Sequence, residues 1–372
     1  IFTSFFAWSQ DKLLTIDDAI TGYHLYPKGL IDLQWLPGGK SFSQIIYEDG
    51  KSYIEVQEIQ KPKGRIISIS LEDVNSSLSD TFNLTRLPRA RWVNNKEFQF
   101  VSGKRAFLYH IELKTSKILP YVISDFVKSP LLFSNGSGYM AHIDNGLNYG
   151  VKDNNHSIIS DVDGIVIGES VHRSEFGITD GLFPSPNYNK LAYYEMDESM
   201  VTEYPLYQLS DTPATAKMLR YPTAGSKSHH VSVKVKNMYD DSDPVIIQTS
   251  GDKEQYLTNV SWTPDEKYLL IAIVNRAQNH MWLNKYDATS GDFISTLFEE
   301  KNDRYVEPEH PAVFLNDDPS KFLWWSERDG YNHLYLYSDE GRLIKQVTQG
   351  NWIVTDFHGV SEDGKNIFIT ST

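Results

Sequence analysis

The chain has 372 residues, 40% hydrophobic and 23% charged, which is enough for two ordinary domains or one large repetitive one. Its formal net charge of −14 argues against nucleic acid or an anionic membrane as the main partner, because binding either one requires Lys and Arg. The sequence contains no cysteine, which excludes disulfides, thiol nucleophiles and Cys-ligated zinc.

The first nine residues are apolar and uncharged. They end in Ala7-Trp8-Ser9, which places small residues where a signal peptidase prefers them. We therefore expect residues 1–9 to be the remnant of a secretory signal; a first β-strand or a hydrophobic strap is the alternative. No run approaches the roughly 18 apolar residues of a membrane span, so no spanning segment is expected.

Residues 10–29 predict a short helix and a lead-in to the rest of the chain. Thr15 can cap this helix and Gly22 can end it, while Asp17 and Asp18 fall in its first turn. Beyond this point almost every segment has the pattern of a β-strand. The aromatic content of 13% favours the same class, since flat rings pack well on pleated surfaces.

A repeated pattern predicts the architecture. An aromatic anchor, a tight turn and a hydrophobic strand recur at intervals of about 40 to 60 residues, with one longer interval. The anchors are Trp35, Trp92, Phe133, Phe183, Trp262, Phe314 and His358. Repeats of roughly 40 to 50 residues with about four strands each are typical of propeller blades. We predict an all-β β-propeller over residues 30–372; a β-sandwich or β-solenoid is the alternative.

Two blades can be traced strand by strand. The fifth has predicted strands at 260–262, 268–274, 281–286 and 293–298, and the sixth at 322–326, 333–337 and 343–348. The longer interval, after Phe183, is rich in proline and turns. This interval, which contains the segments 196–207 and 221–225, is therefore predicted to include an arm that leaves the fourth blade between its second and third strands. The final strand, 366–372, stops without a cap, so we expect an incomplete last blade and a truncated chain.

Local motifs for catalysis are missing from the sequence. No Gly-x-Ser-x-Gly string occurs to expose a nucleophile, and no catalytic triad is predicted within these residues. His229-His230 makes a poor metal site because adjacent strand residues point to opposite faces. The group Glu307, Glu309 and His310 is flanked by prolines and indicates a turn. We expect no metal and no cofactor.

The remaining candidate is Glu175, in the irregular turn-rich stretch 171–186. A carboxylate can accept two or three charge-assisted hydrogen bonds from an ammonium group, each about twice as strong as a neutral one. In a partly desolvated site, this pairing would select peptides with a free amine. A solvated loop Glu paired with Arg173 is the alternative.

At this stretch the chain resembles the N-terminal propeller of the dipeptidyl peptidase IV branch of the prolyl oligopeptidase family. The resemblance covers residues 13–372 and is most similar to bacterial prolyl tripeptidyl aminopeptidases. It depends on five motifs: His172-Arg-Ser-Glu-Phe-Gly, Leu191-Ala-Tyr-Tyr-Glu-Met-Asp-Glu-Ser-Met, Tyr221-Pro-Thr-Ala-Gly, Asn275-Arg-Ala-Gln-Asn and Arg328-Asp-Gly-Tyr-Asn-His.

The resemblance implies an eight-bladed propeller, of which about six to seven blades are covered here, and a C-terminal α/β-hydrolase domain absent from this chain. That domain would carry the catalytic Ser, Asp and His of a serine exopeptidase, so this fragment alone should be inactive. Glu175 would bind the α-ammonium of a peptide, with Arg173 and Ser174 in support. The implied partners are free-amine peptides, the protein's own hydrolase domain and a second copy. The second copy would be joined through an arm at about residues 197–221 that includes Asp197, Tyr204 and Tyr207.

One departure from the family pattern affects specificity. Dipeptidyl members place two consecutive Glu residues before the Phe, whereas Ser174 precedes Glu175 here. A lone Glu is similar to the tripeptidyl branch, so release of tripeptides is expected over dipeptides. We expect a periplasmic or secreted bacterial protein. A non-catalytic propeller that serves as a binding or scaffold module is the rival interpretation, and a member that cleaves without amine recognition is a third.

Overall fold

The computed structural model describes residues 15–22, 29–59, 67–361 and 364–372. The expected signal remnant therefore lies outside the described residues. The chain divides into two compact units, 1–102 with 107–117, and 103–106 with 118–372. No helix among the described residues is long and apolar enough to cross a membrane.

The N-terminal part contains both α-helices of the described chain. Helix α1 (Ile16–Thr21) begins with a capping box in which the side chains of Thr15 and Asp18 bond to each other's backbone N–H groups. Helix α2 (Leu71–Ser76) begins in the same way with Ser70 and Asp73. The first helix was predicted from its cap. The second was not, although Ser70-Leu-Glu-Asp73 carries the same signal.

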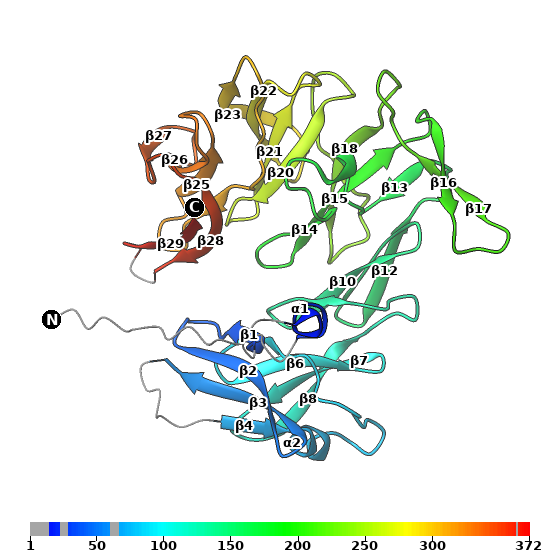
Figure 1. Cartoon of the computed structure of the whole chain (residues 1–372), viewed down its shortest axis with the longest axis vertical. Helices are drawn as coiled ribbons and strands as arrows, with labels where there is room; N and C mark the ends of the chain where they lie inside the picture. Colours follow the sequence, from blue (N-terminus) through cyan, green and yellow to red (C-terminus); the bar gives the residue numbers. More distant parts are fainter. Residues whose placement is uncertain (1–14, 23–28, 60–66, 362–363) are drawn as a thin grey trace. The chain divides into compact units, whose positions relative to one another are not determined.

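Most of the chain forms successive antiparallel sheets (Figure 1). The first sheet contains β1 (Ile31–Trp35), β2 (Ser41–Glu48), β3 (Lys51–Glu58) and β4 (Ile67–Ser70). The second contains β5 (Arg91–Trp92), β6 (Glu97–Ser102), β7 (Arg105–His110) and β8 (Thr115–Val122). The third contains β9 (Leu131–Leu132), β10 (Gly138–Ile143), β11 (Gly146–Val151) and β12 (Asn154–Ile159).

The fourth sheet carries an insertion. It contains β13 (Ile165–Ile167), β14 (Leu182–Pro184), β15 (Lys190–Asp197), β18 (His230–Asn237) and β19 (Val245–Ile246). Strands β15 and β18 pair directly, and the chain between them forms a separate hairpin, β16 (Glu203–Gln208) with β17 (Thr215–Arg220). Figure 1 shows this hairpin extending away from the sheet. We call β16–β17 the arm.

Three sheets complete the chain. The fifth contains β20 (Tyr256–Trp262), β21 (Tyr268–Val274), β22 (His280–Asp287) and β23 (Phe293–Lys301). The sixth contains β24 (Val313–Phe314), β25 (Lys321–Ser326), β26 (His333–Ser338) and β27 (Leu343–Gln346). The last has only two strands, β28 (Val354–Val360) and β29 (Ile367–Ser371).

These sheets confirm the predicted all-β fold of propeller blades, with its short N-terminal helix and its arm between the second and third strands of the fourth blade. Strand β20 is buried at every position and β21 at every position after Tyr268. Burial of both faces explains the continuous apolar run in β21, because the strand packs against a neighbouring blade on each side.

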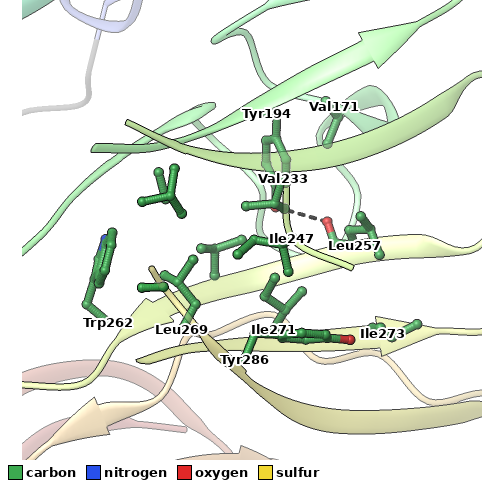
Figure 2. Close-up of a cluster of buried hydrophobic side chains, with 14 of the residues drawn as sticks. Val171, Tyr194, Val233, Ile247, Leu257, Trp262, Leu269, Ile271, Ile273 and Tyr286 are labelled. Carbon is green, nitrogen blue, oxygen red and sulfur yellow. Dashed lines mark hydrogen bonds between the residues drawn. The ribbon is translucent and has the colours of Figure 1, made fainter. Parts of the chain in front are cut away.

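The core between the fourth and fifth sheets supports the candidate site. Tyr194 and Val233 from the fourth sheet pack against Leu257 and Ile271 from the fifth (Figure 2). The Tyr194 hydroxyl donates a hydrogen bond to the Leu257 carbonyl at 2.9 Å, in a fully buried position. Burial raises the pKa of Tyr194. The hydroxyl therefore stays protonated and bonded to β20.

Replacing Tyr194 with Phe is expected to lower the free energy of unfolding by about 1–2 kcal/mol, because the buried Leu257 carbonyl loses its donor. Tyr204→Phe, on the exposed arm, is the matched control and should change it by less than about 0.5 kcal/mol. Denaturant midpoints measure both. Equal changes in the two variants would contradict the assigned bond.

Candidate functional site

The stretch 171–178 forms a tight turn of unusual backbone conformation. His172, Arg173, Ser174 and Phe176 all have positive φ, between 53° and 62°, and none of them is Gly. Such residues are sterically disfavoured in this region by about 1 kcal/mol or more each. Glu175, between Ser174 and Phe176, is extended, with φ −68° and ψ 165°. The surrounding contacts must therefore hold this turn and the direction of its carboxylate.

The Glu175 carboxylate is exposed and contacts the fifth sheet. The Gln278 side chain donates to it at 3.4 Å and to the Tyr256 hydroxyl at 3.0 Å. Arg276 also donates to the Tyr256 hydroxyl, and its guanidinium lies 5.4 Å from the ring centroid. The long bond to Gln278 leaves most of the acceptor capacity of Glu175 open for a ligand with N–H donors.

Two histidines lie beneath the turn. The Leu257 backbone N–H donates to His172 Nε2 at 3.1 Å, so the proton of that ring is on Nδ1. His172 Nδ1 then donates to His229 Nε2 at 3.0 Å. The remaining His229 nitrogen, Nδ1, is buried and has no hydrogen-bond partner. The geometry therefore requires both imidazoles to be neutral.

Burial favours the same protonation state. It holds the pKa of His172 well below its usual range, and His229 and Arg276 add to the effect. Burial also lowers the pKa of His229 to about 4, with further lowering by Arg173, Arg276 and His230 and an opposing contribution from Glu254. Both rings stay uncharged at neutral pH.

The His172–His229 pair makes the free energy of unfolding depend on pH. Below the ordinary histidine pKa of 6.5, the unfolded chain takes up protons that the folded pair refuses, so the free energy of unfolding should fall between about pH 6.5 and about pH 4. His229→Gln removes one titrating ring and should flatten part of that decline. Denaturant midpoints at several pH values measure the difference. An identical pH slope in the two proteins would contradict this effect.

Arg173 does not pair with Glu175. Its guanidinium donates to the Arg220 carbonyl, lies 5.1 Å from the Tyr221 ring centroid and is 3.9 Å from Glu198. These partners lie where the arm joins the fourth sheet. The alternative in which Glu175 is neutralised by Arg173 is therefore not formed, and a direct role of Arg173 in ligand binding stays a prediction.

Ser174 is exposed, and its side chain makes one hydrogen bond, at 3.4 Å to Ser170.

The three residues predicted to lie on the arm do not all lie on it. Tyr204 and Tyr207 are exposed on β16, at 53% and 67%. Asp197 instead ends β15, where it pairs with Ile165 and His230. The arm hairpin thus begins after Asp197, and the boundary predicted at residue 197 lies within the sheet.

More carboxylates surround the turn. Burial raises the pKa of Glu307, and the charges of Glu309, Glu327 and Glu175 raise it further. The Glu307 segment is fixed near the site because the Val306 N–H donates to the Gln278 carbonyl at 2.7 Å. A cavity of about 440 Å³ lies beside this segment, lined by residues of 299–308 and 325–330. The glutamates near the turn favour a cationic ligand, whereas the cavity itself is also lined by Lys301, Arg304 and Arg328.

Among known families, the model described as the dipeptidyl peptidase IV (DPP IV) N-terminal region matches residues 133–372. The chain belongs to this family. It is 32% identical to a candidate dipeptidyl aminopeptidase IV of Bacteroides ovatus, with a TM-score of 0.80, over 93% of this chain and 50% of that one.

Two further relatives match nearly the whole of this chain. Dipeptidyl peptidase 4 of Trichophyton tonsurans is 22% identical over 97% of this chain and 48% of its own. The Porphyromonas gingivalis dipeptidyl peptidase 4 structure, at 22% identity and a TM-score of 0.72, covers 97% of this chain and 52% of that one and supports the fold. The chain thus spans about half the length of the relatives it matches.

The sequence predicts Glu175 as a site residue, a role that stays a prediction, and it assigns no role to the residues that surround Glu175 in the structure. Gln278, Tyr256 and His229 come from segments 103, 81 and 54 positions away along the chain. Gln278 belongs to a motif, Asn275-Arg-Ala-Gln-Asn, that carried the family resemblance without an assigned role. From the sequence, His229 is a candidate only for a metal site together with His230, and a poor one. Its pairing with His172 needed the packed fold.

Proposed function

We propose that this chain is the substrate-recognising propeller region of a serine exopeptidase, and that Glu175 binds the α-ammonium of the peptide. The observation that carries the proposal is the exposed Glu175 carboxylate, held on a strained turn with one long hydrogen bond. The acidic surroundings favour a cation. Family membership and the names of the relatives support peptidase chemistry.

In the proposed enzyme, this region positions the substrate and takes no part in bond cleavage. Fixing the ammonium at Glu175 would set the distance from the N-terminus to the serine of a C-terminal hydrolase domain. Positioning of this kind converts binding energy into rate. The distance would then determine how many residues are removed.

The lone Glu favours release of tripeptides. Ser174 occupies the position where dipeptidyl members carry a second Glu, so one carboxylate of this turn is available to the ammonium. A longer N-terminal stretch then fits before the scissile bond. We propose cleavage after proline at the third residue, in the periplasm or outside the cell.

Product analysis on the full-length protein that carries this chain tests the proposal. Peptides with proline at the second or third position, each free or N-acetylated, are incubated and the products identified by mass spectrometry. We expect tripeptides from the free third-position peptide and little cleavage of its acetylated form. Equal cleavage of free and acetylated peptides would overturn amine recognition, and no cleavage of any peptide would favour the scaffold interpretation.

We further propose that the arm contributes to a homodimer. Large apolar side chains are exposed on both faces of this hairpin. The strand register places Tyr204, Leu206 and Leu219 on one face, and Tyr207 and Met218 on the other.

The double variant Tyr204→Ser, Tyr207→Ser is expected to weaken self-association at least about tenfold. Tyrosines that become buried at an interface often supply much of the binding energy. Sedimentation velocity over a range of concentrations measures it. Tyr47→Ser, 69% exposed on β2, is the control. An unchanged dissociation constant in the double variant would contradict the arm interface.

A further inference from the structure

The Glu175 turn is costly to form. Four consecutive or nearly consecutive non-glycine residues, His172, Arg173, Ser174 and Phe176, have positive φ. Within the turn, the Ser174 N–H donates to the Val171 carbonyl at 3.0 Å, the Glu175 N–H to the His172 carbonyl at 3.2 Å, and the Ile178 N–H to the Glu175 carbonyl at 3.2 Å. Three local bonds of about 1 kcal/mol each offset only part of a conformational strain of several kcal/mol, so tertiary contacts must hold the turn.

His172 supplies one of these contacts, and Phe176, whose carbonyl accepts from the Thr258 hydroxyl, supplies another. His172 is 4% exposed, although it lies three residues before an exposed carboxylate. Strand β20 is an edge strand that pairs only with β21, and the Leu257 N–H would lack a strand partner. His172 Nε2 accepts that N–H in place of a backbone carbonyl. The turn is thereby fastened to the edge of the fifth sheet.

His229 fixes the orientation of the His172 ring. It accepts the His172 Nδ1 proton at 3.0 Å, and the two ring centroids are 5.0 Å apart. With that proton on Nδ1, Nε2 is left free to accept from Leu257. A proton on Nε2 would place two N–H donors against each other. His229 therefore selects the one tautomer that can hold the turn.

The His172 ring is connected to the Glu175 carboxylate through Tyr256. The Tyr256 ring packs edge-on against His172 at 5.0 Å and against Phe176 at 4.9 Å, measured between ring centroids. The Tyr256 hydroxyl accepts from Gln278, which also donates to Glu175. A shift of the His172 ring would move Tyr256 and hence the only donor to Glu175 among the described side chains.

We propose that His172 and His229 are positioning residues, a neutral pair that holds the Glu175 turn and sets the direction of its carboxylate. The proposal rests on Glu175 being the ammonium-binding residue. Charged or titratable groups around the pair are Arg173, Arg276, His230, Glu254 and Tyr256. None of them replaces the hydrogen bond between the two rings.

The test compares two variants of the full-length protein. His229→Leu fills the space without an acceptor, whereas His229→Gln can place Oε1 near the position of Nε2 and accept the same proton. Amide hydrogen exchange of residues 172–177 and steady-state kinetics with a free-amine peptide are measured for both. We expect His229→Leu to speed exchange in the turn at least about tenfold. It should also raise KM about tenfold with kcat within about twofold, and His229→Gln should recover most of both losses.

Unchanged exchange in His229→Leu would overturn the proposal whatever the activity. Faster exchange with an unchanged KM would also overturn it, provided that Glu175→Gln does raise KM in the same assay. A Glu175→Gln variant with parental kinetics would instead refute the proposed function, while the exchange comparison would still decide whether the pair holds the turn.

Discussion

Glu175→Gln in the full-length protein is expected to lower kcat/KM for free-amine peptides by roughly 10- to 100-fold, mainly through KM. Gln keeps the shape and one acceptor oxygen but removes the negative charge. A hydrogen bond to a charged group contributes about 1.5–3 kcal/mol, which corresponds to this range of rates. Steady-state kinetics with one tripeptide-releasing substrate measure the change.

Two comparisons isolate the ammonium contact. An N-acetylated form of the same peptide has no ammonium, so the parent and Glu175→Gln should treat it alike. Glu340→Gln, in the exposed turn after β26, removes an equal charge at a residue with no assigned role and should leave kcat/KM unchanged. A loss in Glu340→Gln equal to that in Glu175→Gln would indicate a general effect of charge and contradict specific binding.

Gly177→Ala is expected to destabilise the protein by about 3 kcal/mol and to raise KM. Gly177 has φ +68°, and an added Cβ would lie 2.0 Å from the Glu309 carbonyl oxygen. The backbone conformation costs Ala about 1 kcal/mol, and crowding of this kind costs about 1–3 kcal/mol more. The turn must therefore shift, and Glu175 lies two residues away. Thermal or denaturant unfolding gives the stability.

Gly103→Ala separates the two contributions. Gly103 has φ +59° but no atom within 4 Å of the Cβ position. It should cost only about 1 kcal/mol and leave KM unaltered. Equal destabilisation by the two substitutions would show that the close approach to Glu309 has no energetic effect.

The fold was largely predictable because its signals are local. Apolar runs such as 268–274 predict the strands, and the strand predicted there coincides with β21. The capping residue Thr15 predicts helix α1. The long interval after Phe183 predicts the arm, which the structure forms as the hairpin of β16 and β17. The strand and the helix follow from a few neighbouring residues, whereas the arm follows from the longer interval between two repeats.

For the candidate site, the sequence predicts one residue, Glu175, whose role stays a prediction. His172-Arg-Ser-Glu-Phe contains no Gly or Asn, the residues that usually mark positive φ, so its backbone conformation could not be inferred. The contacts that hold it come from Leu257, His229 and Gln278, which approach only when the fourth and fifth sheets pack. Sequence spacing contains no information about such long-range pairings.

The histidine pair illustrates the same limit. The sequence suggests that His229 and His230 are neighbours on one strand, but β18 begins at His230 and His229 precedes it. His229 is buried against His172, whereas His230 begins β18 and pairs with Asp197. The hydrogen-bond partner of His229 is thus 57 residues away along the chain, across two strands and the arm.

The most direct test of the central claim is a crystal structure of the full-length protein with a slowly cleaved peptide that has a free N-terminus. We predict that the peptide ammonium nitrogen lies within about 3 Å of a Glu175 carboxylate oxygen, the distance of a charge-assisted hydrogen bond. An ammonium group bound elsewhere, with Glu175 still contacting only Gln278, would contradict the assignment.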